Sequence, residues 1–154
     1  WLKSLYESHL NFPSDVIAQE CREISVEKGR LLPYADWSYN ENENITLPNL
    51  LPIGYGGVLY PAGAMHADTT REELYMQLAP KADDLWFKAM SLMNGVKVRR
   101  PLNPVKKPIP IIGSKGNSLA ESNVVQDGNR KQWEAICNHY NLNPDCTIGF
   151  DCQN

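Results

Sequence analysis

Two adjacent carboxylates, Asp83 and Asp84, are the residues of this chain best suited to acid–base chemistry. A carboxylate beside a bound hydroxyl can remove its proton. The pair also lies at the expected start of a helix, where side-chain oxygens cap free N–H groups and negative charge offsets the helix dipole. If Asp83 is the N-cap, Asp84 has no capping duty. Asp84 is therefore the candidate general base, with dipole compensation as the alternative interpretation.

Three glycines, Gly54, Gly56 and Gly57, precede this pair and a short apolar strand expected at 58–60. Glycine lets a ligand approach the main chain closely because it has no Cβ. Glycines before a strand also serve as a bend or bulge, so both interpretations stay open. The spacing is not that of a phosphate-binding loop, which follows a strand and opens a helix.

Two helices should position the carboxylates. Thr70 and Glu73 match a capping box, which predicts a helix from Thr70 that Pro80 ends and makes Glu73 a capping residue. The second helix should start at the aspartate pair and end at Asn94-Gly95. Its apolar stripe comprises Trp86, Ala89, Met90 and Met93, at positions i, i+3, i+4 and i+7. This spacing predicts a core-facing side, with Lys88 and Ser91 pointing to water.

The order of these features resembles a known family. The strings are G-G-V-L-Y at 56–60, E-E-L at 72–74 and A-D-D-L-W-F-K-A-M at 82–90. They are similar to the second half of bacterial inverting glycosyltransferases of the GT-A fold, which use nucleotide sugars to build polysaccharides. The resemblance extends from Trp1 to about Leu142. It implies an α/β fold, here the C-terminal, acceptor-side half of a GT-A-like mixed sheet flanked by helices.

The resemblance also implies roles for individual residues. Asp84 would be the general base that activates the acceptor hydroxyl. Asp83 and Trp86 would hold the acceptor, and the backbone of Gly56 and Gly57 would line the sugar pocket. Asp83 stands where glutamate is usual in the family, which puts its direct contact with the acceptor in doubt. The partners implied are a nucleotide-sugar donor and a glycan acceptor.

With 154 residues and 42% hydrophobic content, residues 1–154 are expected to form a single domain with a real core. A helix from Trp1 has no preceding N-cap, which suggests a missing upstream part. In the resembled family the segment before such a helix carries a D-x-D type motif that binds a divalent cation and the nucleotide diphosphate. We therefore expect the donor half to lie upstream of Trp1, and this chain to be inactive alone. A Mn or Mg ion would have most of its ligands outside the chain, so no metal ligand is assigned here.

Elsewhere the pattern indicates a buried strand at 16–18, continued by alternation to Val26, and a hairpin turn at Lys28-Gly29. Tyr34 and Trp37 have faces that could stack on a sugar, although burial in the core is the favoured interpretation. Residues 114–128 have the composition of a loop.

The last helix should open at Asn129. Its first turn carries Arg130 and Lys131, which form an anion site in principle, although a solvated basic turn is favoured. His139 is more simply a surface histidine than a metal ligand.

Free thiols are favoured for the four cysteines, Cys21, Cys137, Cys146 and Cys152, because nothing in the sequence marks the protein as secreted. The lack of a C-x-x-C spacing argues against a zinc site. A disulfide between Cys146 and Cys152 stays open. The formal net charge of −3 and the mixed charge pattern argue against a nucleic-acid surface. Without a signal peptide or a run of ~20 apolar residues, no transmembrane segment is expected. A cytoplasmic location follows, with membrane association through a partner or acceptor left open.

Two functions remain compatible with an acidic pair at a helix start. The first is hexosyl transfer with Asp84 as base, and the second is a non-catalytic glycan-binding module. A glycosidase is excluded, because adjacent carboxylates cannot flank a glycosidic bond at the ~5 to 9.5 Å such enzymes use. If the leading strands are missing, exposed sheet edges and apolar surface predict self-association of this chain.

Overall fold

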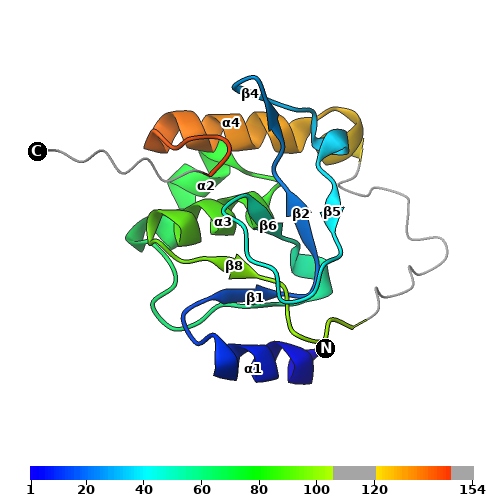
Figure 1. Cartoon of the computed structure of the whole chain (residues 1–154). Helices are drawn as coiled ribbons and strands as arrows, with labels where there is room; N and C mark the ends of the chain where they lie inside the picture. The colour runs from blue at the N-terminus through cyan, green and yellow to red at the C-terminus, as the bar shows by residue number, and fades with distance from the viewer. Residues whose placement is uncertain (106–120, 147–154) are drawn as a thin grey trace, which may run out of the picture.

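The computed structural model describes residues 1–105 and 121–146. These residues form a mixed α/β fold of small sheets and helices, which confirms the predicted fold class at that level (Figure 1). The helices are α1 (Leu2–Asn11), α2 (Glu72–Leu78), α3 (Asp83–Met93) and α4 (Gly128–Tyr140). The strands are β1 (Val16–Ala18), β2 (Cys21–Glu23), β3 (Val26–Glu27), β4 (Arg30–Leu31), β5 (Tyr39–Asn40), β6 (Leu50–Pro52), β7 (Val58–Leu59) and β8 (Val98–Arg99).

The strands form three separate sheets. In the first, of order β7-β1-β8, β1 runs antiparallel to β7 and parallel to β8, with Ile17 opposite both Leu59 and Arg99. The second, of order β5-β2-β6, is antiparallel throughout, and Arg22 pairs with Tyr39 and Leu51. The third is the hairpin of β3 and β4.

The strand expected to run from residue 16 to Val26 is interrupted. The chain leaves β1 at Gln19, whose N–H donates to Gly57 O at 3.1 Å, and Glu20 O accepts from Ile53 N at 2.9 Å. These two bonds bind the chain to different neighbours before and after the break. As a result, β1 and β2 belong to different sheets, and the alternation in the sequence did not show where one ends.

The predicted hairpin turn is confirmed. Lys28 and Gly29 both have positive φ, 50° and 76°, and they connect β3 to β4. Two consecutive residues with positive φ are typical of the type I′ turn, whose twist matches that of the two strands it joins.

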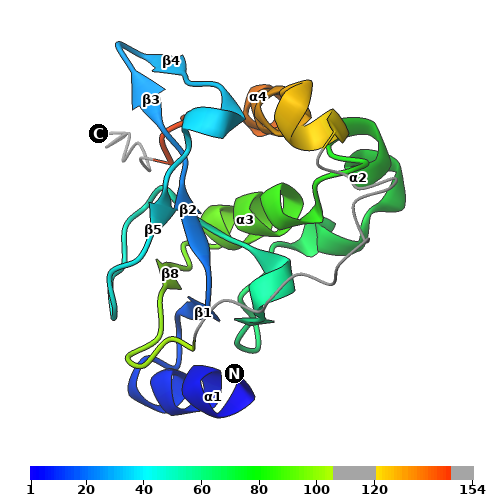
Figure 2. The same cartoon turned by 90° about the vertical axis from the view of Figure 1, so that its right-hand side faces the viewer.

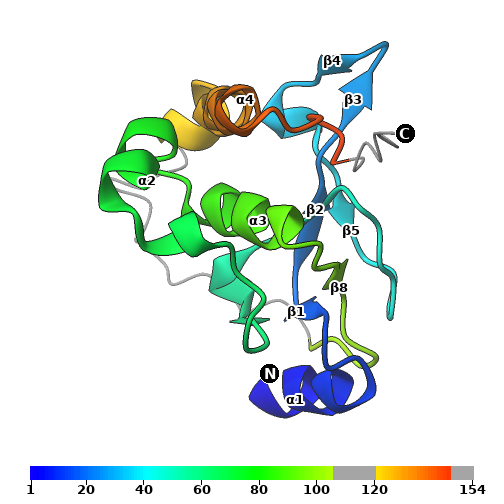
Figure 3. The ribbon, with the colours of Figure 1, turned by 90° about the vertical axis from the view of Figure 1, so that its left-hand side faces the viewer.

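Helix α3 is central to the fold. Figures 2 and 3 show it between β2 and α2, and Figure 1 shows α4 and α1 at opposite ends of the molecule. The apolar stripe is confirmed in its first three members, since Trp86, Ala89 and Met90 are at most 2% exposed. The predicted C-terminus is also confirmed, because α3 ends at Met93 and Gly95 has a φ of 72°.

The polar side predicted for α3 is wrong. Lys88 is 1% exposed and Ser91 is fully buried, because α3 also contacts β6, α4 and the 3₁₀ turn Ala67–Thr70. The Lys88 Nζ donates a hydrogen bond to Pro48 O at 2.6 Å, and the Ser91 hydroxyl donates to Lys88 O at 3.0 Å. The backbone before β6 therefore covers the face that the periodicity assigned to water.

Lys88 supports a prediction about stability. Burial lowers its pKa, so between that lowered value and about 10.4 the unfolded chain binds more protons than the folded protein. We expect Lys88→Met to be more stable than the wild type by about 1 kcal/mol at pH 6, and this gap to shrink as pH rises towards 10. Denaturant unfolding at several pH values measures the gap. The exposed Lys97→Met is the matched control, and a gap that does not vary with pH would contradict the prediction.

The capping box predicted at Thr70 is not formed. Thr70 is the last residue of the 3₁₀ turn, and the N-cap of α2 is Arg71, which makes no side-chain capping bond. Glu73 instead lies 3.0 Å from the Arg71 Nε. The 3₁₀ turn places Thr70 before the helix start, out of the capping position. The end of α2 at Leu78, shortly before Pro80, agrees with the sequence.

The described part of the predicted loop at 114–128 contains a π-helix, Glu121–Val125, leading into α4. Asp127 is the N-cap of α4 with a left-handed φ of 56°, and it accepts a hydrogen bond from Tyr34 N at 2.8 Å. A Cβ at Gly128 would lie 2.4 Å from Ser122 O, so only glycine fits between the two helices. This contact was not visible in the sequence.

Three cysteines, Cys21, Cys137 and Cys146, are free and buried. Cys152 lies outside the described residues, so the open question of a bond to Cys146 is not addressed by the structure. Among the helices of the described ranges, none has the length and apolar content that a bilayer crossing needs.

Candidate functional site

Asp84, the candidate base, connects α3 to the turn before β7. Its Oδ1 accepts a hydrogen bond from the backbone N–H of Gly54 at 2.9 Å, in the 3₁₀ turn Gly54–Gly56. A Cβ at Gly54 would lie 2.7 Å from this oxygen, so glycine is required for the contact. The expectation that Asp84 has no structural duty is therefore wrong. The N-cap of α3 is Ala82, so Asp83 is not the cap either.

The surroundings of Asp84 make it a weaker acid than usual. Burial raises its pKa to about 6, the Gly54 N–H opposes this rise, and the neighbouring Asp83 adds to it. The Oδ2 oxygen makes no hydrogen bond to any residue within 1–105 or 121–146, and the side chain is partly exposed. A carboxylate that is mostly ionised at neutral pH, yet holds a proton more tightly than usual, has the properties of a general base.

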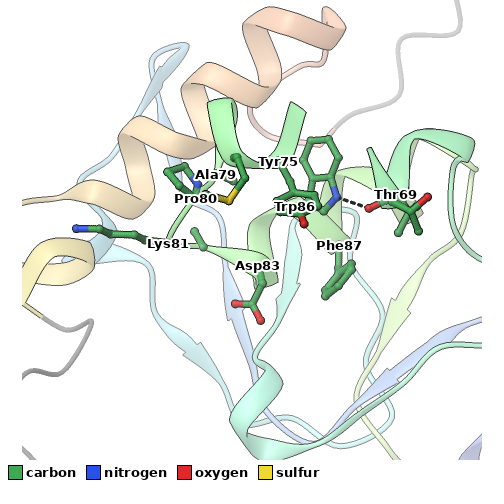
Figure 4. Close-up of a pocket in the computed structure, with 11 residues that line it drawn as sticks. Thr69, Tyr75, Ala79, Pro80, Lys81, Asp83, Trp86 and Phe87 are labelled. Carbon is green, nitrogen blue, oxygen red and sulfur yellow. Dashed lines mark hydrogen bonds between the residues drawn. The ribbon is translucent and has the colours of Figure 1, made fainter. Parts of the chain in front are cut away.

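Asp83 points elsewhere. It is exposed and lines a pocket of about 650 Å³ beside α2 and α3 (Figure 4). The other lining residues are Thr69, Thr70, Tyr75, Met76, Ala79, Pro80, Lys81, Ala82, Trp86 and Phe87. Within the described residues, the Asp83 carboxylate has no ion pair or side-chain hydrogen bond. Asp84 is not among the lining residues, so the side chains of the two adjacent acids lie in different environments.

Trp86 lines the same pocket but is only 2% exposed. Its indole N–H donates to Thr69 O at 3.0 Å, and its ring meets those of Tyr75 and Tyr140 at centroid distances of 6.3 and 6.2 Å. The polar edge of the indole is thus already used inside the protein. The structure gives Trp86 the contacts of a core residue that supports the pocket wall.

Gly56 and Gly57 lie away from this pocket, and protein side chains occupy the space beside them. A Cβ at Gly56 would lie 3.1 Å from Cγ of Glu20, and one at Gly57 would lie 2.8 Å from the ring of Trp1. Gly57 also has a φ of 98°, which disfavours other residues. These contacts agree with the bend interpretation of the glycine segment.

Tyr60 was not singled out from the sequence, yet it packs against α3, the helix that carries the two acids. Its ring contacts that of Phe87 at a centroid distance of 5.7 Å and an interplanar angle of 58°. Burial raises the pKa of its phenol, and the nearby Asp84 and Asp83 raise it further. A tyrosine directly after a short strand is too common a feature to mark a site, and only the fold reveals this proximity.

Tyr34 and Trp37 are buried, at 7% and 1% exposure, as the favoured interpretation predicted. Their rings pack together at 5.0 Å, and the Trp37 indole N–H donates to Leu32 O. Neither face is open to a sugar.

Both cations in the first turn of α4 already have partners within the protein. Arg130 forms an ion pair with the Asp127 carboxylate and another with Glu134 at 2.7 Å. The Lys131 Nζ donates to Gln126 O at 3.0 Å. An incoming anion at this helix start would have to compete with Asp127.

A second pocket, of about 390 Å³, surrounds Arg100 on the β5-β2-β6 sheet. Arg100 is 8% exposed and donates to the carbonyls of Asn40 at 2.6 Å and Gln19 at 3.3 Å. These bonds hold β5 to the end of β1. The guanidinium therefore has a structural role, which the sequence did not predict.

Metal-ligating side chains do not gather in the described ranges: no group of three or more His, Cys, Asp or Glu lies close enough to hold an ion there. His139 packs edge-on against Tyr140 at 4.6 Å, and Tyr140 donates a hydrogen bond to Asp68 at 3.1 Å. His66 receives the Asp68 N–H on its Nδ1 at 3.2 Å. These groups form a local hydrogen-bond cluster between α4 and the 3₁₀ turn before α2.

The arrangement thus offers one acid suited to proton removal and a second acid at an apolar pocket lined by aromatic rings. Its interpretation depends on this geometry and on the motif resemblance described above. Comparison of the chain with protein-family models, with curated proteins and with solved structures found no match.

Proposed function

We propose that this chain is the acceptor side of an inverting glycosyltransferase, which transfers a hexose from a nucleotide-diphosphate sugar to a glycan hydroxyl. The observation that carries the proposal is the state of Asp84. One oxygen is fixed by the Gly54 N–H at 2.9 Å, the other is free of hydrogen bonds to the described residues, and burial raises the pKa to about 6. Capping of a helix requires none of these three features.

The reaction follows from this geometry. The Gly54 N–H orients the carboxylate, and the free Oδ2 accepts the proton of the acceptor hydroxyl. The acceptor oxygen forms a bond to the anomeric carbon as the bond from that carbon to the diphosphate breaks. The proton stays on Asp84, the diphosphate leaves with the bonding electron pair, and a single displacement inverts the anomeric configuration.

The nucleotide-sugar donor, its diphosphate and the divalent cation are implied by the resemblance to the glycosyltransferase family. The side chains within the described ranges do not form a set able to hold such a cation, so we derive no step through it. The cytoplasmic location is part of the same proposal. Self-association is also proposed, because Trp1 and the α1 residues Leu2 and Leu10 are each more than 60% exposed, and light scattering would report it.

A non-catalytic glycan-binding module is the second candidate. The pocket beside Asp83 supports it, since an apolar cavity of about 650 Å³ with a few polar groups at its edge is typical of a ligand site. This pocket does not include Asp84. A binding module would need only the pocket, whereas a transferase needs the free oxygen of Asp84 as well.

The dependence of transfer on pH tests the catalytic proposal. We expect the rate of the full-length enzyme, measured with a panel of UDP-hexoses and glycan acceptors, to rise about tenfold per pH unit well below 6 and to level off above it, because only ionised Asp84 takes a proton. Circular dichroism at each pH serves as the control for folding. A rate that stays constant from pH 4.5 to 8 would contradict the assigned role.

A further inference from the structure

The ring pair of Tyr60 and Phe87 forms a wall beside the first turn of α3. Tyr60 follows β7 and is partly exposed, and its ring lies 5.7 Å from that of Phe87 between centroids. Phe87 comes one helical turn after Asp83, so the two side chains leave α3 on neighbouring positions of one face. Figure 4 shows both of them extending away from the indole of Trp86. Asp83 and Phe87 therefore line the same pocket from one face of α3.

The phenol of Tyr60 is a hydrogen-bond donor without an acceptor in the described part of the chain. Burial raises the pKa of this phenol most, and the negative charges of Asp84 and Asp83 raise it further. The phenol therefore keeps its proton throughout the neutral range. The Tyr60 ring thus packs against Phe87, and the Asp83 carboxylate lies one helical turn before Phe87 on the same face of α3.

We propose that Tyr60, Phe87 and Asp83 form the binding site for a neutral pyranose ring, the acceptor sugar of the reaction above, and that Trp86 supports this site from the core. Calling this sugar the acceptor rests on the proposed function, whereas the binding site itself does not. Sugars present an apolar C–H face that suits aromatic rings, and hydroxyls that need both donors and acceptors. Tyr60 supplies the donor and Asp83 the acceptor.

The charge of the site selects among sugars. Asp83 is exposed and unpaired within the described residues, and Asp84 is mostly ionised above pH 6. Lys81, the lining residue with a positive charge, extends away from Asp83 in Figure 4. Two carboxylates repel an anionic ligand, since like charges at such a site disfavour each other. A neutral hexoside is therefore expected to bind better than a uronic acid.

The experiment is an NMR titration of the chain with methyl glucoside, methyl galactoside and methyl mannoside, and with methyl glucuronoside as the anionic probe. We expect at least one neutral glycoside to shift the resonances of Tyr60, Phe87 and Asp83, with a dissociation constant in the millimolar range. Tyr60→Phe keeps the ring and removes only the hydroxyl, so it should weaken binding roughly 3- to 10-fold. Methyl glucuronoside should bind more weakly than its neutral counterpart.

Tyr6→Phe on the exposed surface of α1 is the matched control, because it makes the same chemical change far from the site. Melting temperatures of both variants report any change in folding. The inference is overturned if no neutral glycoside shifts these resonances, if Tyr60→Phe binds as tightly as the wild type, or if the glucuronoside binds best.

Failure of the proposed function gives a different pattern. If glycosides bind in a way that depends on Tyr60, but transfer is unaffected by Asp84→Asn, the binding site is supported and the catalytic role of Asp84 is contradicted. If transfer requires Asp84 while Tyr60→Phe leaves glycoside binding unchanged, the catalytic role is supported and this binding site is contradicted.

Discussion

Asp84→Asn is expected to lower the rate of glycosyl transfer by about 10²- to 10⁴-fold, the usual contribution of a general base. Asparagine is nearly the same size as aspartate, and its Oδ1 can still accept the hydrogen bond from the Gly54 N–H. Its amide cannot take a proton at neutral pH. Transfer assays on the full-length enzyme, with donor and acceptor saturating, measure the effect. The exposed Asp36→Asn makes the same change in charge elsewhere and should leave the rate unchanged.

The same substitution should increase stability. The pKa of Asp84 is about 6 in the folded protein and about 4 in the unfolded chain, so the folded state binds more protons between these values. Ionisation of Asp84 therefore reduces the free energy of unfolding as pH rises from about 4 through 6. Allowing for partial exposure, we expect Asp84→Asn to be about 1 kcal/mol more stable than the wild type at pH 7.5, and no more stable at pH 3.5.

These two results together distinguish a catalytic role from a structural one. A residue kept for stability loses stability when it is replaced, whereas a base held in an unfavourable environment loses only activity. An Asp84→Asn enzyme with a normal rate would rule out the proposed mechanism. An inactive variant that is also strongly destabilised would show that the bond to Gly54 N, and not proton transfer, is what Asp84 provides.

Trp86→Ala should have the largest effect on stability, reducing the free energy of unfolding by about 3–5 kcal/mol. The indole is 2% exposed and packs between Tyr75 and Tyr140, so its removal leaves a cavity where α2, α3 and α4 meet. Thr69 O would also lose its hydrogen bond from the indole N–H. Denaturant unfolding measures this loss. Trp1→Ala is the control, because Trp1 is 63% exposed and its truncation should change stability by no more than about 0.5 kcal/mol.

Trp86→Phe separates support from direct contact with a ligand. Phenylalanine keeps much of the buried volume and loses the N–H, so a cost of about 1–2 kcal/mol is expected. The folded variant should bind glycosides nearly as well as the wild type, because the N–H already donates to Thr69 O. A tenfold loss of binding in a well-folded Trp86→Phe protein would instead return Trp86 to the acceptor site, as the resemblance implied.

Local patterns in the sequence correctly predicted features that depend on neighbouring residues. The Lys28-Gly29 turn, the end of α3 at Asn94-Gly95 and the end of α2 before Pro80 are confirmed. Each depends on the φ angles or missing N–H of one or two residues, so no distant contact is needed to specify it. The mixed α/β class and the buried side of α3 are confirmed for the same reason, since helical periodicity is itself local.

The candidate site was predicted in part. Adjacent acids at a helix start were visible in the sequence, and the structure places Asp84 against the glycine segment through Gly54, two residues before Gly56. Their separation into different environments was not visible, because successive helix positions point about 100° apart and the surrounding segments decide what each one meets. Tyr60 was missed because it comes from another part of the chain and packs against α3 only in the folded protein.

The sequence by itself thus determined the mixed α/β class, the ends of α2 and α3 and the presence of an acidic pair at the start of a helix. The tertiary structure decided which faces are buried and which residues meet. Lys88 shows why: periodicity assumes that a helix has one covered side, but α3 is covered by β6, α4 and the turn before α2 together. Burial, and with it the pKa of Asp84 and the pKa of Lys88, depends on segments far away in the chain, and no local pattern encodes where those segments lie.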